Sequence, residues 1–191
     1  MHYLVMVIGE DVEAQLEPFY QDLEVDEYEV DVVDGYEKER MLEHYARKGE
    51  QYKTFEECYE ARGEDWNYNR YRKDSDGVWR EYSTFNPNAE WDWYEIGGRW
   101  AGEIRVKEGV EYEKPSFSWG WSEEEKKKVL AERRADTALL KDIANVEQLS
   151  CYSIVHDGEW IYVGDDSKEE VQSLLKTLSP DTRITFVDCH M

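Results

Sequence analysis

The stretch from Asn86 to Gly102, NPNAEWDWYEIGGRWAG, carries the side chains best suited to hold a ligand. Aromatic rings can stack on a flat molecule, and a guanidinium can grip a phosphate or carboxylate through two parallel hydrogen bonds. Both chemistries meet within a few positions here. The sequence therefore predicts an aromatic wall beside one arginine, suited to a nucleotide-like small molecule and formed by Trp91, Trp93, Tyr94, Arg99 and Trp100.

Alternation along a strand decides which of these side chains share a face. The pattern predicts Trp91, Trp93 and Glu95 on one face, with Asp92, Tyr94 and Ile96 on the other. Gly97 and Gly98 would supply a turn that larger residues could not make. The same stretch could instead form the core of a small subdomain, with Arg99 in an internal salt bridge to Asp92 or Glu95. The sequence is compatible with both interpretations.

A second candidate for chemistry lies at the two ends of the chain. In a last strand, Asp188 and His190 would project from one face and Cys189 from the other. If that strand lies beside the first one, His2 comes close to both. Imidazole and carboxylate ligands suit zinc, manganese or iron, so a metal-dependent hydrolase or phosphodiesterase is the enzyme alternative.

Catalytic signatures are otherwise missing from the sequence. Asp188, His190 and His2 follow no standard metal-binding spacing, so we favour hydrogen bonds from Asp188 and His190 across the end of the sheet, and we expect no metal or other cofactor. The chain contains neither G-x-S-x-G nor a phosphate-binding loop of the G-K-[ST] type. We therefore expect a binding protein rather than an enzyme.

Acidic residues dominate the composition, with 45 Asp and Glu against 23 Lys and Arg and a net charge of −22. The segment from Glu10 to Asp34 holds eleven acids and no Lys or Arg. Such a field repels nucleic acid, which excludes direct DNA or RNA binding, and attracts basic protein surfaces. The segment is predicted to imitate phosphates and block a nucleic-acid-binding or defence protein, with its partner-binding acids at Asp22, Glu24, Asp26, Glu27, Glu29 and Asp31.

One basic cluster, in a hairpin predicted at 68–82, could neutralise part of that segment from within: Arg70, Arg72, Lys73 and Arg80. The alternative reading of the acidic excess is that it only keeps a cytoplasmic protein dissolved.

Periodicity and helix caps predict the elements that position these residues. Removing the middle of the chain leaves the order strand, helix, strand, strand, helix, strand, which is that of an α+β ferredoxin-like sandwich. Residues 1–9 and 122–191 would form this core, and residues 10–121 an inserted acidic and Trp-rich subdomain. The predicted elements are strands at 3–8, 103–107 and 182–189, a hairpin at 151–164, and helices at 36–48, 54–63, 123–144 and from Ser167 onward.

Targeting signals and cysteine spacing point to the cytoplasm. No apolar run approaches the ~20 residues that cross a bilayer, and the first residues lack the features of a signal peptide. The widely spaced Cys58, Cys151 and Cys189 predict buried, reduced thiols rather than disulfides. This composition is also compatible with a homo-oligomer and with no membrane partner.

Three stretches together resemble an uncharacterised family of small proteins carried by tailed phages and prophages of bacteria: VIGEDVEAQLEPFYQDLEV near the start, NPNAEWDWYEIGGRWAG in the middle and SPDTRITFVDCHM at the end. Relatives commonly finish in D-C-H-I, where this chain has Asp188-Cys189-His190-Met191. The resemblance transfers no activity. It implies a phage accessory protein, for which counter-defence or takeover of host machinery is a common role.

Overall fold

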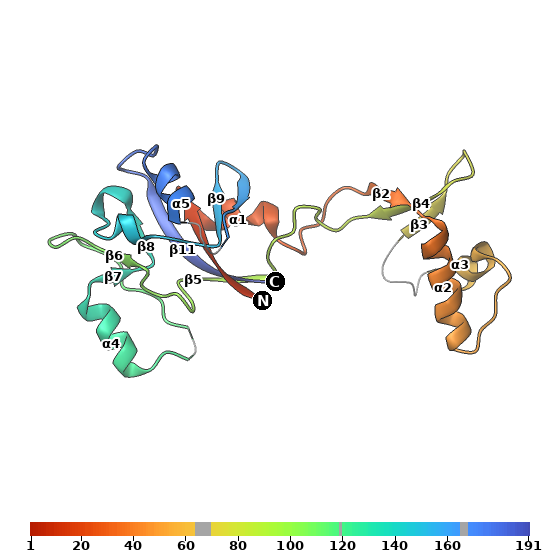
Figure 1. Cartoon of the computed structure of the whole chain (residues 1–191), viewed down its shortest axis with the longest axis horizontal. Coiled ribbons are helices and arrows are strands. Elements are labelled where there is room, and N and C mark those ends of the chain that lie inside the picture. Colours follow the sequence, from red (N-terminus) through yellow and green to blue (C-terminus); the bar gives the residue numbers. More distant parts are fainter. Residues whose placement is uncertain (64–69, 119, 165–167) are drawn as a thin grey trace. The chain divides into compact units, whose positions relative to one another are not determined.

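The protein, described by a computed structural model, is an α+β chain that divides into two compact units (Figure 1). Unit 1 joins Met1–Leu23 to Asn86–Met191, and unit 2 is Glu24–Phe85. Unit 2 is therefore shorter than the expected 10–121 insertion, because residues on both sides of it belong to unit 1. The structure describes residues 1–63, 70–118, 120–164 and 168–191.

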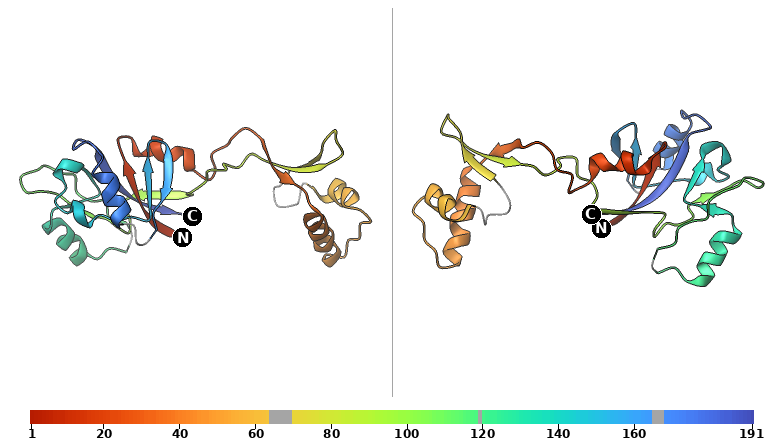
Figure 2. Two further views of the ribbon diagram at one scale, coloured as in Figure 1. Left: turned by 45° about the horizontal axis from the view of Figure 1, so that its top comes forward. Right: turned by 180° about the vertical axis from the view of Figure 1, so that it is seen from behind.

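The first and last strands form the centre of unit 1, as predicted. Strand β1 (His2–Ile8) runs antiparallel to β11 (Arg183–His190) (Figure 2). Their register extends from His2 opposite His190 to Ile8 opposite Ile184. The apolar run Leu4–Ile8 of β1 and the buried residues Ile184–Cys189 of β11 suit strands covered on both faces. This pairing brings the two ends of the chain together.

The full strand order of this sheet is β10-β9-β1-β11-β5, and β8 pairs with the start of β11. The predicted ferredoxin-like order is not confirmed. In that fold a strand separates the two parallel strands of the first βαβ unit, whereas here β1 and β9 are direct parallel neighbours. The bounds are Trp93–Ile96 for β5, Thr137–Leu139 for β8, Ser153–His156 for β9 and Glu159–Tyr162 for β10.

One predicted helix of unit 1 is much shorter than expected. Helix α4 (Glu123–Ala131) begins with the predicted capping box of Ser122 and Glu125, but it does not continue to Ala144. Arg133 takes a left-handed conformation (φ 55°), and the chain turns into β7 (Arg134–Ala135), which pairs with β6 (Ile104–Arg105). Pairing with distant strands overrides the local helical pattern.

Two apolar clusters cover the two faces of the sheet. Val5 and Val7 pack with Leu16 of α1 (Val12–Leu16) and with the 3-10 turn Glu17–Phe19. On the opposite face, Met6 and Ile8 share a cluster with α5 (Lys168–Leu175). The predicted start of that helix at Ser167 lies outside the described residues.

Unit 2 packs two helices with a three-stranded sheet of order β2-β4-β3. Asp34 and Thr54 accept backbone N–H groups at the starts of the helices, and Met41, Tyr45 and Phe55 lie in the core. The two predicted helices and the predicted hairpin are confirmed, apart from hairpin residues 68–69, which are not described. The bounds are Tyr28–Val32 for β2, Gly35–Arg47 for α2, Phe55–Arg62 for α3, Arg70–Lys73 for β3 and Trp79–Ser83 for β4.

Within the described ranges, no helix combines the length and apolar character needed to span a membrane. The three cysteines are buried and free of disulfide bonds, as predicted: Cys58, Cys151 and Cys189.

Candidate functional site

The ends of β1 and β11 bring His2, Asp188 and His190 together, as predicted. His2 Nδ1 lies 2.8 Å from Asp188 Oδ1, and the two histidine rings are 4.8 Å apart between centroids. His190 Nδ1 lies 2.8 Å from Asp92 Oδ1, and this contact lowers the pKa of Asp92 below its usual range. The result is two adjacent histidine–carboxylate pairs.

These pairs do not amount to a metal site. Of the residues that the structure describes, no three His, Cys, Asp or Glu side chains are arranged to hold a metal ion. Each histidine already uses its Nδ1 atom for a carboxylate, and Asp188 also accepts the backbone N–H of Arg99 at 3.1 Å. The arrangement therefore matches the hydrogen-bonding interpretation of this end of the sheet.

Asp188 and Asp136, both buried, fix the loop that carries Gly97 and Gly98. Asp136 accepts the N–H groups of Gly102 and Ser116 at 2.7 Å each. A Cβ atom on Gly97 would lie 2.4 Å from the carboxylate of Asp136. The paired glycines are therefore needed for a close approach of backbone to two carboxylates.

Asp136 was not found from the sequence, because it falls in the stretch predicted to be helical. Burial raises its pKa above the usual value, although its two backbone donors oppose the shift. Glu95 on β5 also has a raised pKa, first through burial and then through the nearby charges of Asp188 and Asp136. Three acidic groups thus meet beside the glycine loop.

Arg99 lies in this acidic surrounding rather than in a prepared anion site. Its side chain is 61% exposed, and its Nε atom is 4.0 Å from Asp188 Oδ2. The shallow pocket of about 300 Å³ beside Arg99 is also lined by Glu125. An anion bound there would face carboxylates. The carboxylate that Arg99 approaches is that of Asp188, and not that of Asp92 or Glu95, the two salt-bridge partners expected from the sequence.

The predicted aromatic wall does not form as one surface. Trp91 is buried, donates its Nε1–H to Leu16 O at 2.9 Å, and meets the edge of Tyr94 at 4.9 Å. Trp93 is 47% exposed on the opposite face, where its ring meets that of His2. The alternation fails because β5 begins only at Trp93, so Trp91 precedes the strand and instead bridges to Tyr20.

A groove beside α1 unites the aromatic stretch with the acidic segment. It measures about 470 Å³ and is lined by rings of Tyr20, Trp91 and Tyr94 and by carboxylates of α1 and its flanks. Burial and the charges of Glu13 and Asp11 raise the pKa of Tyr94. We call this the α1 groove: Asp11, Glu13, Ala14, Glu17, Tyr20, Trp91 and Tyr94.

Asn86, the first residue of the aromatic stretch, fixes one wall of the α1 groove. Its buried side chain donates to the backbone oxygens of Pro18 and Tyr20 at 2.7 and 2.9 Å. Tyr20 then stacks at a tilt on Trp91, with 4.7 Å between ring centroids. The sequence identified the aromatic residues and the acidic residues of this groove separately. Only the fold shows that they lie together.

The six acids predicted to contact a partner belong to both units. Asp22 lies in unit 1, and the other five lie in unit 2. Glu27 pairs with Arg72 and Arg70, and Glu29 with Arg80, so the predicted internal neutralisation is confirmed. In the described parts of the chain, no ion-pair partner faces the exposed side chains of Glu24, Asp26 and Asp31.

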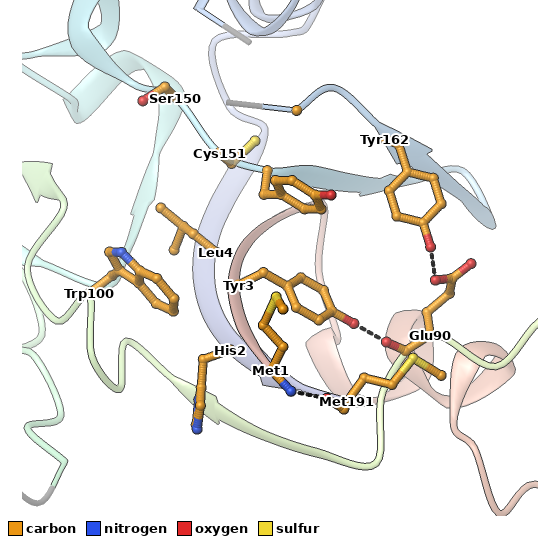
Figure 3. A pocket seen from close by; sticks show the side chains of 12 residues that line it. Met1, His2, Tyr3, Leu4, Glu90, Trp100, Ser150, Cys151, Tyr162 and Met191 are labelled. Atoms are coloured by element: carbon orange, nitrogen blue, oxygen red, sulfur yellow. Dashed lines mark hydrogen bonds between the residues drawn. The ribbon is translucent and has the colours of Figure 1, made fainter. Parts of the chain in front are cut away.

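A larger pocket of about 630 Å³ lies beside the first residues of β1 (Figure 3). Trp100, the last predicted ligand-binding residue, lines one part of it, away from the α1 groove. Tyr3, Tyr162 and Glu90 line another part (Figure 3). We call it the tyrosine pocket.

Comparison with models of known protein families gives no match for this chain. Comparisons with curated proteins and with solved structures likewise give no significant match.

Proposed function

We propose that this protein is a binding protein without catalytic activity, and that it holds a basic surface of another protein. The observation that carries the proposal is the α1 groove, where three carboxylates surround an aromatic floor. An arginine or lysine side chain entering it would meet the faces or edges of the rings and the charges of Asp11, Glu13 and Glu17.

The charge of each unit supports a basic partner. Unit 1 contains 27 acids and 13 bases, and unit 2 contains 18 acids and 10 bases. Each of the six arginines of unit 2 has a carboxylate within 4.0 Å, so the positive charges of these arginines are neutralised within the unit. Such a field steers a basic surface toward the protein and repels nucleic acid.

A nucleotide-like ligand, the other binding mechanism that the sequence suggests, has less support. Trp91 and Tyr94 lie on the other face of the sheet from Trp93, and Arg99 lies near Asp188. We therefore propose the acidic mechanism, in which the aromatic residues of the α1 groove also contact the basic partner. Because the chain resembles phage proteins, we propose that it acts as a counter-defence or host-takeover factor. In the cytoplasm of the host it would occupy the basic groove of a nucleic-acid-binding or defence protein.

Paired variants test this mechanism. Glu13→Gln with Glu17→Gln removes two charges from the α1 groove, whereas Glu124→Gln with Glu170→Gln removes two from exposed positions on α4 and α5. Each tagged protein is mixed with lysate of a bacterial host across a series of salt concentrations, and the captured proteins are identified by mass spectrometry.

We expect the wild type to capture a basic nucleic-acid-binding protein at low salt and to release it as salt screens the charges. The groove variant should lose that protein, and the matched control should keep it. Capture that is equal for both variants, or that does not respond to salt, would rule out the α1 groove as the contact.

A further inference from the structure

We propose that the tyrosine pocket binds a small organic cation of the alkylammonium class, with Glu90 as its counter-charge. The pocket lies within unit 1 and shares neither residues with the α1 groove nor any step with the proposed function. Its shape, charge and aromatic lining carry the inference.

Backbone hydrogen bonds fix the walls of the pocket. The N–H of Tyr152 donates to Leu4 O at 2.9 Å, which ties the loop before β9 to β1. The N–H groups of Val163 and Gly164 both donate to Tyr152 O at 3.0 Å. The pocket is therefore built on the central strand and on the end of the β9–β10 hairpin.

Three tyrosine rings border one part of this space. The rings of Tyr3 and Tyr152 are 5.9 Å apart between centroids, and those of Tyr152 and Tyr162 are 6.4 Å apart. Tyr3 and Tyr162 both direct their hydroxyl groups toward Glu90 (Figure 3). Several aromatic rings around one space are the usual recognition element for quaternary or methylated ammonium groups, because each ring face attracts a cation.

Glu90 supplies a fixed negative charge at this part of the pocket. Its Oε2 atom accepts the hydroxyl of Tyr162, and its backbone oxygen accepts that of Tyr3. Within the described ranges, no hydrogen bond reaches Oε1, which leaves this oxygen for a ligand. Burial and the contact with Glu90 raise the pKa of Tyr162 to about 12, so the phenol keeps its proton and donates it to the hydrogen bond with Glu90.

Few positive charges oppose a cation here. Among the lining residues that the structure describes, there is no Lys or Arg. The α-ammonium group of Met1 donates to a main-chain oxygen of Met191, and His2 is bound to Asp188. Among the described side chains of the lining, Glu90 is the one carboxylate, and these side chains favour a positive ligand over a negative one.

The remaining lining is apolar and sets the second feature of the ligand. Leu4, Trp100, Met1 and Met191 border the pocket (Figure 3). A volume of about 630 Å³ exceeds what a bare ammonium group fills, and pockets of this size hold molecules with an apolar body. The ligand is therefore an ammonium group attached to an apolar or aromatic body, either as a free amine or as a methylated lysine side chain.

Calorimetric titration of the full chain with defined probes tests the proposal. Benzyltrimethylammonium supplies the cation and an apolar body, and choline with its neutral isostere 3,3-dimethyl-1-butanol isolates the charge. We expect benzyltrimethylammonium to bind, and choline to bind about tenfold more tightly than its isostere. A trimethyllysine peptide and its unmethylated form distinguish a side chain from a free amine as the natural source.

Glu90→Gln should weaken binding of benzyltrimethylammonium about tenfold, because it removes the counter-charge and keeps the shape. Tyr162→Phe retains the ring and removes only the hydroxyl that orients Glu90, so a smaller loss is expected. Glu159→Gln removes one exposed charge from the same hairpin and should leave binding unchanged. Equal affinity for choline and its isostere, unchanged binding in Glu90→Gln, or no binding of any cation by the folded wild type would overturn the proposal. The isostere comparison needs no variant, so it decides the matter even if Glu90→Gln fails to fold.

Discussion

A Cβ atom on Gly98 would lie 2.5 Å from the Cβ atom of Asp188, closer than such atoms approach in folded proteins. Asp188 is almost fully buried and accepts the N–H of Arg99 beside this glycine. The glycine pair in the aromatic stretch is thus explained by packing against carboxylates, which is a structural role rather than a ligand-binding one.

Gly98→Ala should destabilise unit 1 by roughly 2–5 kcal/mol, because it adds a steric clash to the strain of a left-handed backbone (φ 54°). Gly109→Ala is the matched control, since Gly109 also has a positive φ of 80° but has open space around its Cβ position. The control should cost only about 1–2 kcal/mol. Urea unfolding measures both, and equal losses would show that the clash with Asp188 is relieved at no cost.

Asp136 should make the protein less stable as the pH rises above about 3.8, its usual pKa. Burial raises the pKa of Asp136 in the folded state, so the folded protein keeps this proton after the unfolded chain has released it. Stability must then fall with rising pH until the folded-state pKa is passed. The difference in unfolding free energy between the wild type and Asp136→Asn, measured from pH 3 upward, isolates this contribution.

Asp136→Asn also loses one acceptor for the N–H groups of Gly102 and Ser116. It should therefore be less stable than the wild type by about 1–3 kcal/mol near pH 3, where Asp136 is protonated in both states. This difference in unfolding free energy between the wild type and Asp136→Asn should narrow as the pH rises. A gap that widens instead would mean that Asp136 favours its charged form in the folded protein.

The sequence predicted the centre of the sheet better than its edges. The apolar run at the start of the chain placed β1, and the break at Pro180-Asp181 placed the start of β11. The adjacency of His2 to His190 followed from expecting these two strands side by side. The helix expected to end at Ala144 failed because Arg133 turns the chain, and its guanidinium holds Val110 O and Lys107 O in a distant loop. Apolar spacing cannot distinguish a helix from short strands whose partners lie far away in sequence.

The candidate site was predicted in parts rather than as a whole. The sequence identified Trp91 and Tyr94 as aromatic contacts and the segment after Glu10 as an acidic contact. It could not show that they share the α1 groove, because Trp91 lies just before β5 and its partner Tyr20 is distant in sequence. Asp136 and Glu90 gave no signal, since one buried or pocket-lining acid among so many is not distinguishable by composition.

Removal of metal ions should leave the protein unchanged. His2 and His190 bind carboxylates through Nδ1, and Asp188 is occupied by His2 and by the N–H of Arg99. EDTA should therefore not alter the melting temperature, and added zinc should not raise it. The metal-dependent hydrolase alternative would be supported if EDTA lowered the melting temperature and if zinc reversed that loss in the wild type but not in His190→Ala.

Arg99→Ala distinguishes the two interpretations that the sequence left open for the aromatic stretch. The guanidinium is 61% exposed and its Nε atom lies 4.0 Å from Asp188 Oδ2, so its removal should cost less than about 1 kcal/mol. Asp188→Ala is the contrasting variant, because it leaves the N–H of Arg99 and the imidazole of His2 without their acceptor and should cost about 1–3 kcal/mol or more. Thermal unfolding of both variants beside a screen of nucleotides gives the readout. We expect a small shift for Arg99→Ala, a large one for Asp188→Ala and no nucleotide binding by the wild type. A nucleotide that stabilises the wild type but not Arg99→Ala would restore the anion site, and a large loss of stability in Arg99→Ala would make its contact with Asp188 a true internal salt bridge.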